Sequence, residues 1–291
     1  MLEAGTAPED EAVQKAIDWL FENLIRVPGD WSYRAPDLEP AGWAFQFENT
    51  LYPDVDDTPM VLMALLRAGA LNQGAHRENI RKAVNWVIGM QSSDGGWGAF
   101  DIDNNYLYLN NIPFADHGAL LDPSTSDLTG RCIEMLAMLG YGRDFPPVAR
   151  GLQFLRREQE TFGGWFGRWG VNYIYGTWSV LKGLGRLGED VSQPYIQKAV
   201  DWLKSCQNPD NGWGETCYSY KDPSLAGKGE STPSQTAWAL LGLMAVGEVE
   251  SSAVQRGIHY LITHQDSDGR WDEQIFTGTG FPNVFYLRYH G

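Results

Sequence analysis

The chain has few of the groups on which several protein classes depend. It contains three cysteines in 291 residues and no CxxC spacing, which argues against a disulfide framework and against a zinc ribbon. Its 22 Lys and Arg residues are outnumbered by 37 Asp and Glu residues, and the net charge of −15 disfavours nucleic acid as a partner. No export signal is visible, and the longest apolar run is about half a membrane span, so we expect a cytoplasmic protein.

Aromatic residues and glycine are abundant instead. The sequence contains 12 Trp, 13 Tyr and 12 Phe residues, together with 33 Gly residues. This aromatic content exceeds what the volume of a core requires. It therefore predicts that some of the rings face a ligand rather than the interior of the fold.

A short segment with a Gln and a Trp six residues apart occurs four times. Each copy follows a stretch with the apolar periodicity of a helix, and a Gly-bearing turn separates the Gln from the Trp. We therefore expect the Gln to end a helix and the Trp to fold back over that end as a structural staple. A fifth, degraded copy runs from Trp19 to Trp31. The four complete copies are residues 91–97, 159–165, 207–213 and 265–271.

Two kinds of helical segment alternate between these turns. One kind is amphipathic, and the other is nearly all apolar and rich in small residues. The pairs Thr58-Pro59 and Thr232-Pro233 are favourable helix starts. The pattern predicts an all-α fold, a single α/α toroid or barrel of five to six helix pairs with the apolar helices inside and a site at one end. The expected inner helices are 58–70, 126–139, 175–187 and 232–246, and the outer ones are 12–24, 79–90, 148–158, 196–206 and 253–264.

The segment YPDVDDTP places Asp54, Asp56 and Asp57 together at the start of an apolar helix, with no basic residue nearby in sequence. An EF-hand loop is excluded because Pro59 and Leu65 stand where Gly and Glu are required. A diphosphate-binding Mg²⁺ cluster and helix capping remain open alternatives. Crowded like charges in a buried place favour a protonated carboxyl. In a dry pocket lined by aromatic rings, such a group is a Brønsted acid, and a carbocation formed there would survive.

Taken together, these segments resemble the squalene-hopene cyclase branch of the class II terpene cyclases. The resemblance rests on PDVDD, the Gln and Trp turns, GRWGVNYIYGTW at 167–178, AGKGESTPSQTAWAL at 226–240 and GTGFPNVFYLRY at 278–289. It covers nearly the whole chain. Family enzymes protonate a terminal alkene with the middle aspartate of a DxDD motif and guide a ring-forming cation cascade. The resemblance implies no metal and no organic cofactor.

The resemblance also implies roles for individual residues. Asp56 matches the aspartate that protonates the alkene, and Asp54, Asp57 and Asp127 match carboxylates that tune this acid and relay its proton. Tyr175 matches a tyrosine near the acid, where a hydrogen-bonded water could reload the proton. The positions that match the aromatic lining of the substrate pocket are Trp31, Phe45, Phe100, Trp169, Phe281, Phe285 and Tyr289.

One residue departs from the family pattern beside the acid. The best-known members carry a histidine in the helix after a DxTxH pattern, whereas DLTGRC places Arg131 there. A permanent cation opposes protonation of a carboxyl that it touches. We therefore expect Arg131 to pair with Asp54 or Asp127 and to stabilise the cluster after Asp56 has lost its proton.

Length is the second departure, because family members are usually much longer and carry a second toroid upstream. We expect residues 1–291 to form one class II cyclase domain, a natural single-domain enzyme rather than a fragment. The far end of its pocket would be open to a substrate with a bulky polar end. A polyprenylated aromatic acid or phenol, cyclised to a polycyclic meroterpenoid, is therefore favoured over the alternative of squalene cyclisation by a larger or fragment enzyme.

Other functions share part of this pattern. A protein prenyltransferase β-type subunit needs a zinc site, and the five histidines show no clear pairing with the cysteines. An α/α-toroid glycosidase would use two carboxylates and aromatic platforms. A non-catalytic lipid-binding toroid would leave the crowded aspartates unexplained. The expected partner is a linear polyprenyl or prenylated aromatic substrate. Because such compounds are hydrophobic, we also expect peripheral contact with a membrane.

Overall fold

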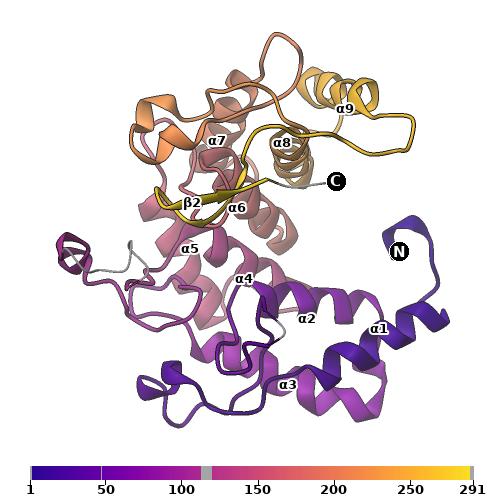
Figure 1. The fold of residues 1–291 in the computed structure, drawn as a ribbon, viewed down its shortest axis with the longest axis vertical. Helices are drawn as coiled ribbons and strands as arrows, with labels where there is room; N and C mark the ends of the chain where they lie inside the picture. Colours follow the sequence, from indigo (N-terminus) through magenta and orange to yellow (C-terminus); the bar gives the residue numbers. More distant parts are fainter. Residues whose placement is uncertain (1, 47, 113–119, 289–291) are drawn as a thin grey trace.

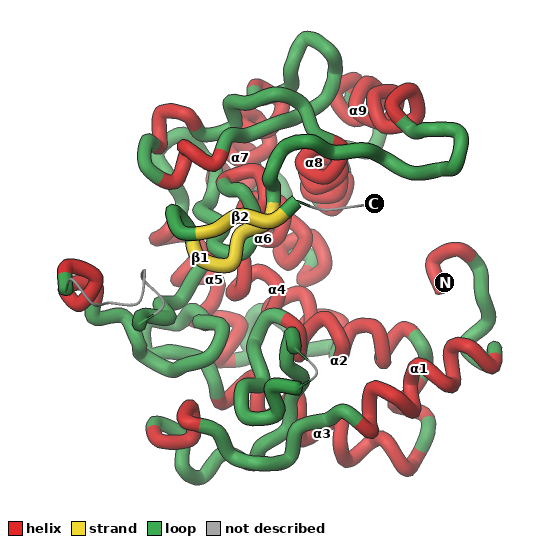
Figure 2. The backbone as a smooth tube through the Cα atoms, viewed as in Figure 1, coloured by secondary structure: helices red, strands yellow, loops and turns green. Residues whose placement is uncertain are grey.

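The computed structural model describes residues 2–46, 48–112 and 120–288, and α-helices dominate them (Figure 1, Figure 2). None of these described helices is long and apolar enough to cross a membrane. The α-helices are α1 (Glu11–Glu22), α2 (Asp57–Arg67), α3 (Gly74–Gly89), α4 (Ser126–Met138), α5 (Pro146–Glu158), α6 (Tyr173–Leu187), α7 (Pro194–Ser205), α8 (Pro233–Ala245) and α9 (Ser252–His264). Short 3₁₀-helices lie at Leu2–Ala4, Asp30–Tyr33, Ala70–Asn72, Leu107–Asn111, Cys217–Tyr220 and Pro223–Leu225. The strands β1 (Gly278–Phe281) and β2 (Phe285–Leu287) form an antiparallel hairpin.

The helices form two layers. The apolar helices α2, α4, α6 and α8 pack against one another in chain order, and each also contacts the helix that follows it, α3, α5, α7 or α9. Figure 1 shows this progression from α2 and α3 in the lower part to α8 and α9 in the upper part. The two central inner helices are the most buried ones, since every residue from Ser126 to Leu136 of α4 and most residues of α6 are buried. The predicted alternation of inner and outer helices is confirmed.

The number of helix pairs is smaller than predicted. The described residues contain four inner and outer pairs plus α1, rather than five to six pairs. The degraded copy at 19–31 contributes one outer helix, α1. After α9 the chain continues as loops and the β1–β2 hairpin. That last segment contains GTGFPN, whose glycines and proline disfavour a further helix.

The Trp residues of the four turns are structural staples, as predicted. Each indole N–H donates to the backbone carbonyl ten residues earlier, at the end of the preceding outer helix. These bonds join Trp97 to Val87, Trp165 to Leu155, Trp213 to Leu203 and Trp271 to Leu261, at 2.7, 2.7, 2.7 and 2.8 Å. Three of the Trp backbone N–H groups also donate to a buried threonine hydroxyl on the next inner helix, namely Thr129, Thr177 and Thr236. Each of these three staples therefore ties an outer helix to an inner one.

The fifth staple is formed by Trp43, so the assignment of Trp31 to this place was wrong. The Trp43 indole donates to the carbonyl of Leu20 at 2.6 Å, and its backbone N–H donates to the Thr58 hydroxyl at 2.9 Å. Trp31 is instead buried in the core, where its ring meets Trp86 edge to face at 5.7 Å. The loop before Trp43 is longer than in the other copies, so the six-residue spacing could not locate it.

The two predicted helix starts differ in outcome. Helix α8 begins at Pro233, and Thr232 accepts a hydrogen bond from the backbone N–H of Gln235 at 3.2 Å, so this start is confirmed. Helix α2 begins at Asp57, and Thr58 lies inside it with its hydroxyl used by Trp43. The backbone donors at the start of α2 are bound by another side chain, that of Asp54.

Candidate active site

The candidate site lies near the N-terminal ends of α2 and α6 and beside the middle of α4. Asp56 immediately precedes α2, Arg131 lies in α4, and Tyr175 lies in α6. Helices α4 and α6 approach closely because both carry glycine at their contact, and a Cβ on Gly183 would lie 2.3 Å from the Gly130 carbonyl oxygen. This close approach brings Arg131 to Tyr175, and the Arg131 Nη2 donates to the Tyr175 hydroxyl at 3.1 Å.

Arg131 pairs with the proposed acid itself. Its Nη1 forms an ion pair with the Asp56 Oδ1, and the two side chains are 10% and 24% exposed. The expectation that Arg131 would pair with Asp54 or Asp127 was therefore wrong. The physical reason is that Asp54 and Asp127 are occupied by backbone N–H groups, whereas the Asp56 carboxyl faces α4.

Asp54 holds the loop that carries the acidic cluster. Its buried carboxylate accepts backbone N–H groups from Phe45, Asp56 and Asp57, at 3.0, 2.9 and 2.6 Å. It therefore satisfies donors at the start of α2, which is the capping role that the sequence left open as an alternative. Burial raises the pKa of Asp54 well above its usual value, and the charge of Asp57 raises it further.

Asp57 lies beside Asp54 at the start of α2, and its backbone N–H donates to the Asp54 carboxyl at 2.6 Å. Burial raises the pKa of Asp57. Burial and crowding thus favour the protonated form of both carboxyls, and the retention of a proton on Asp56 stays a prediction.

Asp127 and a further buried acid, Asp122, hold loops that carry aromatic rings. Asp127 accepts backbone N–H groups from Leu128, Arg168 and Trp169, at 3.0, 2.8 and 3.1 Å. Asp122 accepts those of Ala99, Phe100 and Asp101, at 3.0, 2.5 and 2.8 Å. Burial raises the pKa of both carboxyls. These contacts give the two acids a positioning role that the sequence did not indicate.

Four of the predicted aromatic residues form a continuous row of rings. Phe100 meets Trp169 at 6.0 Å, Trp169 meets Phe281 at 6.1 Å, and Phe281 meets Phe285 at 5.9 Å between ring centroids. The β1–β2 hairpin supplies the last two rings, and it is held beside Trp169 because the Val171 backbone N–H donates to the Thr277 carbonyl at 2.8 Å. The guanidinium of Arg168 lies over Trp169 and Phe281, at 5.5 and 5.8 Å.

The other predicted aromatic residues have separate places. Phe45 is 73% exposed and lies at the edge of a cavity. Trp31, assigned to the substrate pocket, is 1% exposed and lies in the core, so the structure does not place it where a substrate could touch it. Tyr289 lies outside the described residues.

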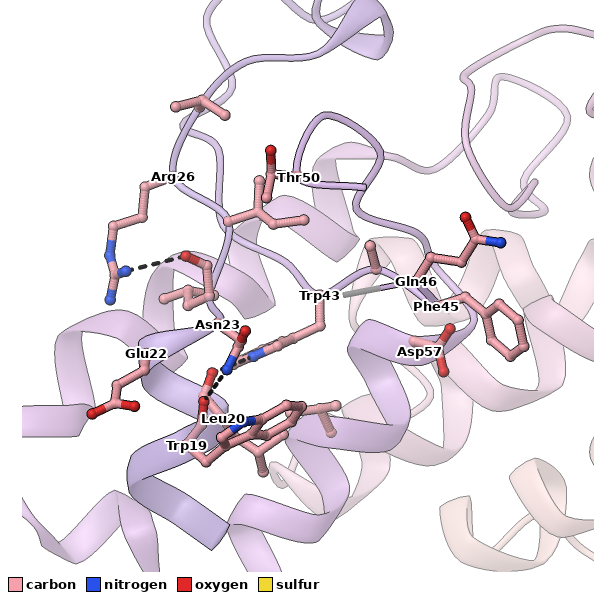
Figure 3. Close-up of a pocket in the computed structure, with 15 residues that line it drawn as sticks. Trp19, Leu20, Glu22, Asn23, Arg26, Trp43, Phe45, Gln46, Thr50 and Asp57 are labelled. Atoms are coloured by element: carbon pink, nitrogen blue, oxygen red, sulfur yellow. Dashed lines mark hydrogen bonds between the residues drawn. The ribbon is translucent and has the colours of Figure 1, made fainter. Parts of the chain in front are cut away.

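A cavity of about 520 Å³ borders the acidic cluster on the side of α1 (Figure 3). Its wall includes Trp19, Trp43, Phe45 and Asp57, and Figure 3 shows Phe45 and Asp57 beside each other at one end. Asp57 thus faces this cavity, whereas Asp56 pairs with Arg131 on α4. The acidic cluster therefore has the cavity on one side, at Asp57, and helix α4 on the other side, at Asp56.

Two aromatic residues beside the acid were missed from the sequence. Trp178 on α6 and Trp238 on α8 stack at 6.0 Å with an interplanar angle of 12°, and both rings meet the edge of Tyr175. A signal was available, because Tyr175 and Trp178 stand three residues apart on a predicted helix and therefore share a face. In the part of the chain that the structure describes, no group of three or more His, Cys, Asp or Glu side chains could hold a metal ion.

Comparison with known proteins shows first the fold and then the family. A type II terpene cyclase variant, MstE from Scytonema, in complex with geranylgeranyl dihydroxybenzoate, has the same fold with a TM-score of 0.64. The match covers 94% of this chain and 70% of that one at 20% identity, and it confirms the α/α toroid. The chain also matches the squalene-hopene cyclase C-terminal domain over residues 1–291, and it therefore belongs to that family.

Curated relatives agree with this family. The squalene-hopene cyclase of Zymomonas mobilis is 54% identical over 295 residues, which cover 100% of this chain and 45% of the relative. That of Alicyclobacillus acidocaldarius is 50% identical over 286 residues, which cover 98% of this chain and 45% of the relative. The chain thus spans a little under half the length of these relatives.

Proposed function

We propose that this chain performs class II terpene cyclisation, in which Asp56 protonates the terminal alkene of a linear polyprenyl compound. The observation that carries the proposal is the difference between the groups that contact each acid. Asp54 and Asp127 are each bound to three backbone N–H groups, whereas the Asp56 side chain is partly exposed and faces Arg131. Asp56 can therefore give up a proton without releasing a loop, and its match to the middle aspartate of the DxDD motif distinguishes it from Asp57.

Arg131 fits this chemistry despite being a permanent cation. It pairs with one carboxyl oxygen of Asp56, which leaves the other oxygen to carry the proton. When that proton moves to the alkene, a carbon–hydrogen bond forms, the positive charge passes to the hydrocarbon, and Asp56 becomes a carboxylate. The guanidinium stabilises this carboxylate, which makes the protonated form a stronger acid.

The aromatic row then stabilises the cation. A carbocation near the faces of Phe100, Trp169 and Phe281 gains roughly 0.5–2 kcal/mol from each well-placed ring. Loss of a proton or capture of water ends the cascade, and Asp56 must be reprotonated before the next turnover. The Tyr175 hydroxyl accepts a hydrogen bond from Arg131, and this contact supports a role for Tyr175 in organising water for this step.

We propose squalene as the first substrate to test and a prenylated hydroxybenzoate as the second. The relatives that are 54% and 50% identical to this chain over the aligned residues are named squalene-hopene cyclases. The preference for a prenylated aromatic substrate rested on chain length. The MstE variant was solved in complex with geranylgeranyl dihydroxybenzoate, which is the substrate of that protein. The view that residues 1–291 act as a single-domain cyclase stays a prediction.

The test is incubation of the purified chain with squalene and, separately, with geranylgeranyl dihydroxybenzoate, followed by mass spectrometry and NMR of the products. Cyclised product of unchanged mass, or of mass increased by one water, is expected from at least one of them. Unchanged compounds in both reactions would contradict the proposal. Bound zinc, or hydrolysis of an oligosaccharide, would instead support the prenyltransferase or the glycosidase alternative.

We also propose peripheral membrane contact through an exposed aromatic loop. The loop contains the 3₁₀-helix Leu107–Asn111, and its Tyr106, Leu107, Tyr108 and Ile112 are all exposed. The guanidinium of Arg34 lies over the Tyr106 ring at 5.9 Å. Tyrosine and basic side chains are favoured at the boundary between lipid and water, and a polyprenyl substrate would be taken up there.

Sedimentation with phosphatidylcholine vesicles tests this contact. We expect the double variant Leu107→Ser, Tyr108→Ser to bind vesicles several-fold more weakly than the wild type, because it removes two exposed apolar side chains. Tyr218→Ser is the matched control, since Tyr218 is as exposed as Tyr108 but lies in another loop. Equal vesicle binding by all three proteins would contradict the assignment of this loop.

A further inference from the structure

The indole of Trp178 is surrounded by charged and aromatic groups next to the acid. The Arg131 guanidinium carbon lies 6.0 Å from its ring centroid, and the Lys182 ammonium lies 5.8 Å from it. Trp238 stacks against it, and the edge of Tyr175 meets it at 5.3 Å. Trp178 therefore touches the same guanidinium that pairs with Asp56.

Three contacts fix this guanidinium in different directions. Its Nη1 pairs with Asp56, its Nη2 donates to the Tyr175 hydroxyl, and its face lies over Trp178. An arginine side chain has many rotamers, and ordering it has an entropic cost. An indole face attracts a cation and at the same time limits where it can lie.

We propose that Trp178 is a positioning residue for the acid, because its indole, supported by Trp238, holds Arg131 in the orientation that pairs with Asp56. This inference rests on the proposed function of Asp56 but concerns a residue to which no role has been given. The charged group that faces the Asp56 carboxyl is Arg131 from α4, which also donates to the Tyr175 hydroxyl from α6, while Asp54 binds the Asp56 backbone N–H and Asp57 is the next residue in the chain. Trp178 acts on the acid through Arg131.

Lys182 does not take over this role. Its ammonium lies 3.3 Å from the carboxylate of Glu134, which is buried. The Lys182 ammonium is thus paired with Glu134 rather than with Asp56. A substitution of Lys182 therefore changes the surroundings of the Trp178 indole without removing the contact between Trp178 and Arg131. Lys182→Gln is accordingly a matched control for substitutions of Trp178.

The kinetic test compares Trp178→Leu, Trp178→Phe and Lys182→Gln with the wild type, each on the acidic plateau of its own profile of kcat against pH. We expect Trp178→Leu to lower kcat about tenfold, equivalent to ~1.4 kcal/mol, with KM nearly unchanged, because the guanidinium loses its fixed place. Trp178→Phe keeps a ring and should retain most of the activity. Lys182→Gln should behave as the wild type.

A double-mutant cycle separates positioning from contact with the substrate. In an Arg131→Gln background, Trp178→Leu should have little further effect on kcat, because the residue that it orients is gone. An equal fold-loss in both backgrounds would overturn the proposal. A rise in KM with kcat unchanged would also overturn it, since that result means that Trp178 binds the substrate directly.

A readout without substrate keeps this inference distinguishable from the proposed function. The Asp56 carboxyl can be titrated by ¹³C NMR in the wild type and in Trp178→Leu and Trp178→Phe. A tenfold weaker pairing with Arg131 moves the titration midpoint of Asp56 upward by about one pH unit. An unchanged midpoint in a folded Trp178 variant contradicts the proposal even if the chain cyclises its substrate, and a shifted midpoint supports it even if no tested compound is cyclised.

Discussion

Asp56→Asn is expected to lower the rate of cyclisation by roughly 10²–10⁴-fold, the usual contribution of a general acid. The amide keeps the size of the side chain but cannot give up a proton to an alkene. Asn can still accept a hydrogen bond from Arg131, so the fold should be retained. Product formation by the variant and the wild type, measured at equal concentrations with the substrate that the wild type converts, checks this result.

The matched control for this prediction is Asp201→Asn. Asp201 is an exposed aspartate on α7, far along the chain from the acidic cluster, and the same chemical change there should leave the rate unaltered. Circular dichroism and thermal unfolding of both variants establish that they are folded. If Asp56→Asn formed product as fast as Asp201→Asn, another residue would be the acid.

Arg131→Ala is expected to change the pH profile of cyclisation in two opposite ways. The guanidinium stabilises the carboxylate that proton transfer leaves, so its loss should lower kcat at acidic pH by about tenfold or more. The same loss makes Asp56 harder to ionise, so the decline of activity with rising pH should begin at a higher pH. A profile of kcat against pH for both proteins checks the two effects together.

Arg131→His provides the matched variant for this prediction. An imidazolium beside Asp56 has a pKa above the ordinary histidine value of about 6.5, because the carboxylate stabilises its charge. The stabilisation from this pair is complete below about pH 6.5 and is lost as the pH rises through the raised folded-state pKa. The variant should therefore resemble the wild type at acidic pH and Arg131→Ala at alkaline pH. Superimposable profiles for all three proteins would contradict a role for Arg131.

Stability should also respond to Arg131→Ala. Removing one partner of a fully buried ion pair costs about 3–5 kcal/mol, and the cost here should be smaller because the Asp56 side chain is 24% exposed. Comparing the free energies of unfolding of the two proteins shows whether a lower activity comes from unfolded protein or from a slower chemical step. Denaturant unfolding of the variant and the wild type at neutral pH measures this difference.

Much of the scaffold could be predicted from local sequence patterns. Apolar periodicity located both kinds of helix, and the spacing of Gln and Trp located four turns, because helices and their end turns are formed by residues close in sequence. The described residues contain fewer helix pairs than predicted, since the degraded copy contributes only the outer helix α1 and the segment after α9 forms loops and the β1–β2 hairpin. The fifth staple was missed because the longer loop before Trp43 breaks the six-residue spacing.

The candidate site was predicted unevenly. The crowding of Asp54, Asp56 and Asp57 is visible in eight residues of sequence, and the family resemblance assigned the aromatic row of Phe100, Trp169, Phe281 and Phe285. The partners of the acids were not visible. Backbone N–H groups leave no mark in the amino-acid sequence. The sequence therefore did not indicate that backbone N–H groups of loops bind the Asp54 and Asp127 carboxyls.

By itself, the sequence determined the all-α alternation of helices, the repeated staples and the cluster of acids at the start of α2, because each depends on neighbours along the chain. Tertiary structure alone decided that Arg131 pairs with Asp56, that Trp178 lies beside Arg131 and that Trp238 stacks on Trp178. Those contacts join Asp56, which precedes α2, to residues on α4, α6 and α8, and they depend on how closely glycines let α4 approach α6. Distances between helices are set by packing, which no single segment of the chain encodes.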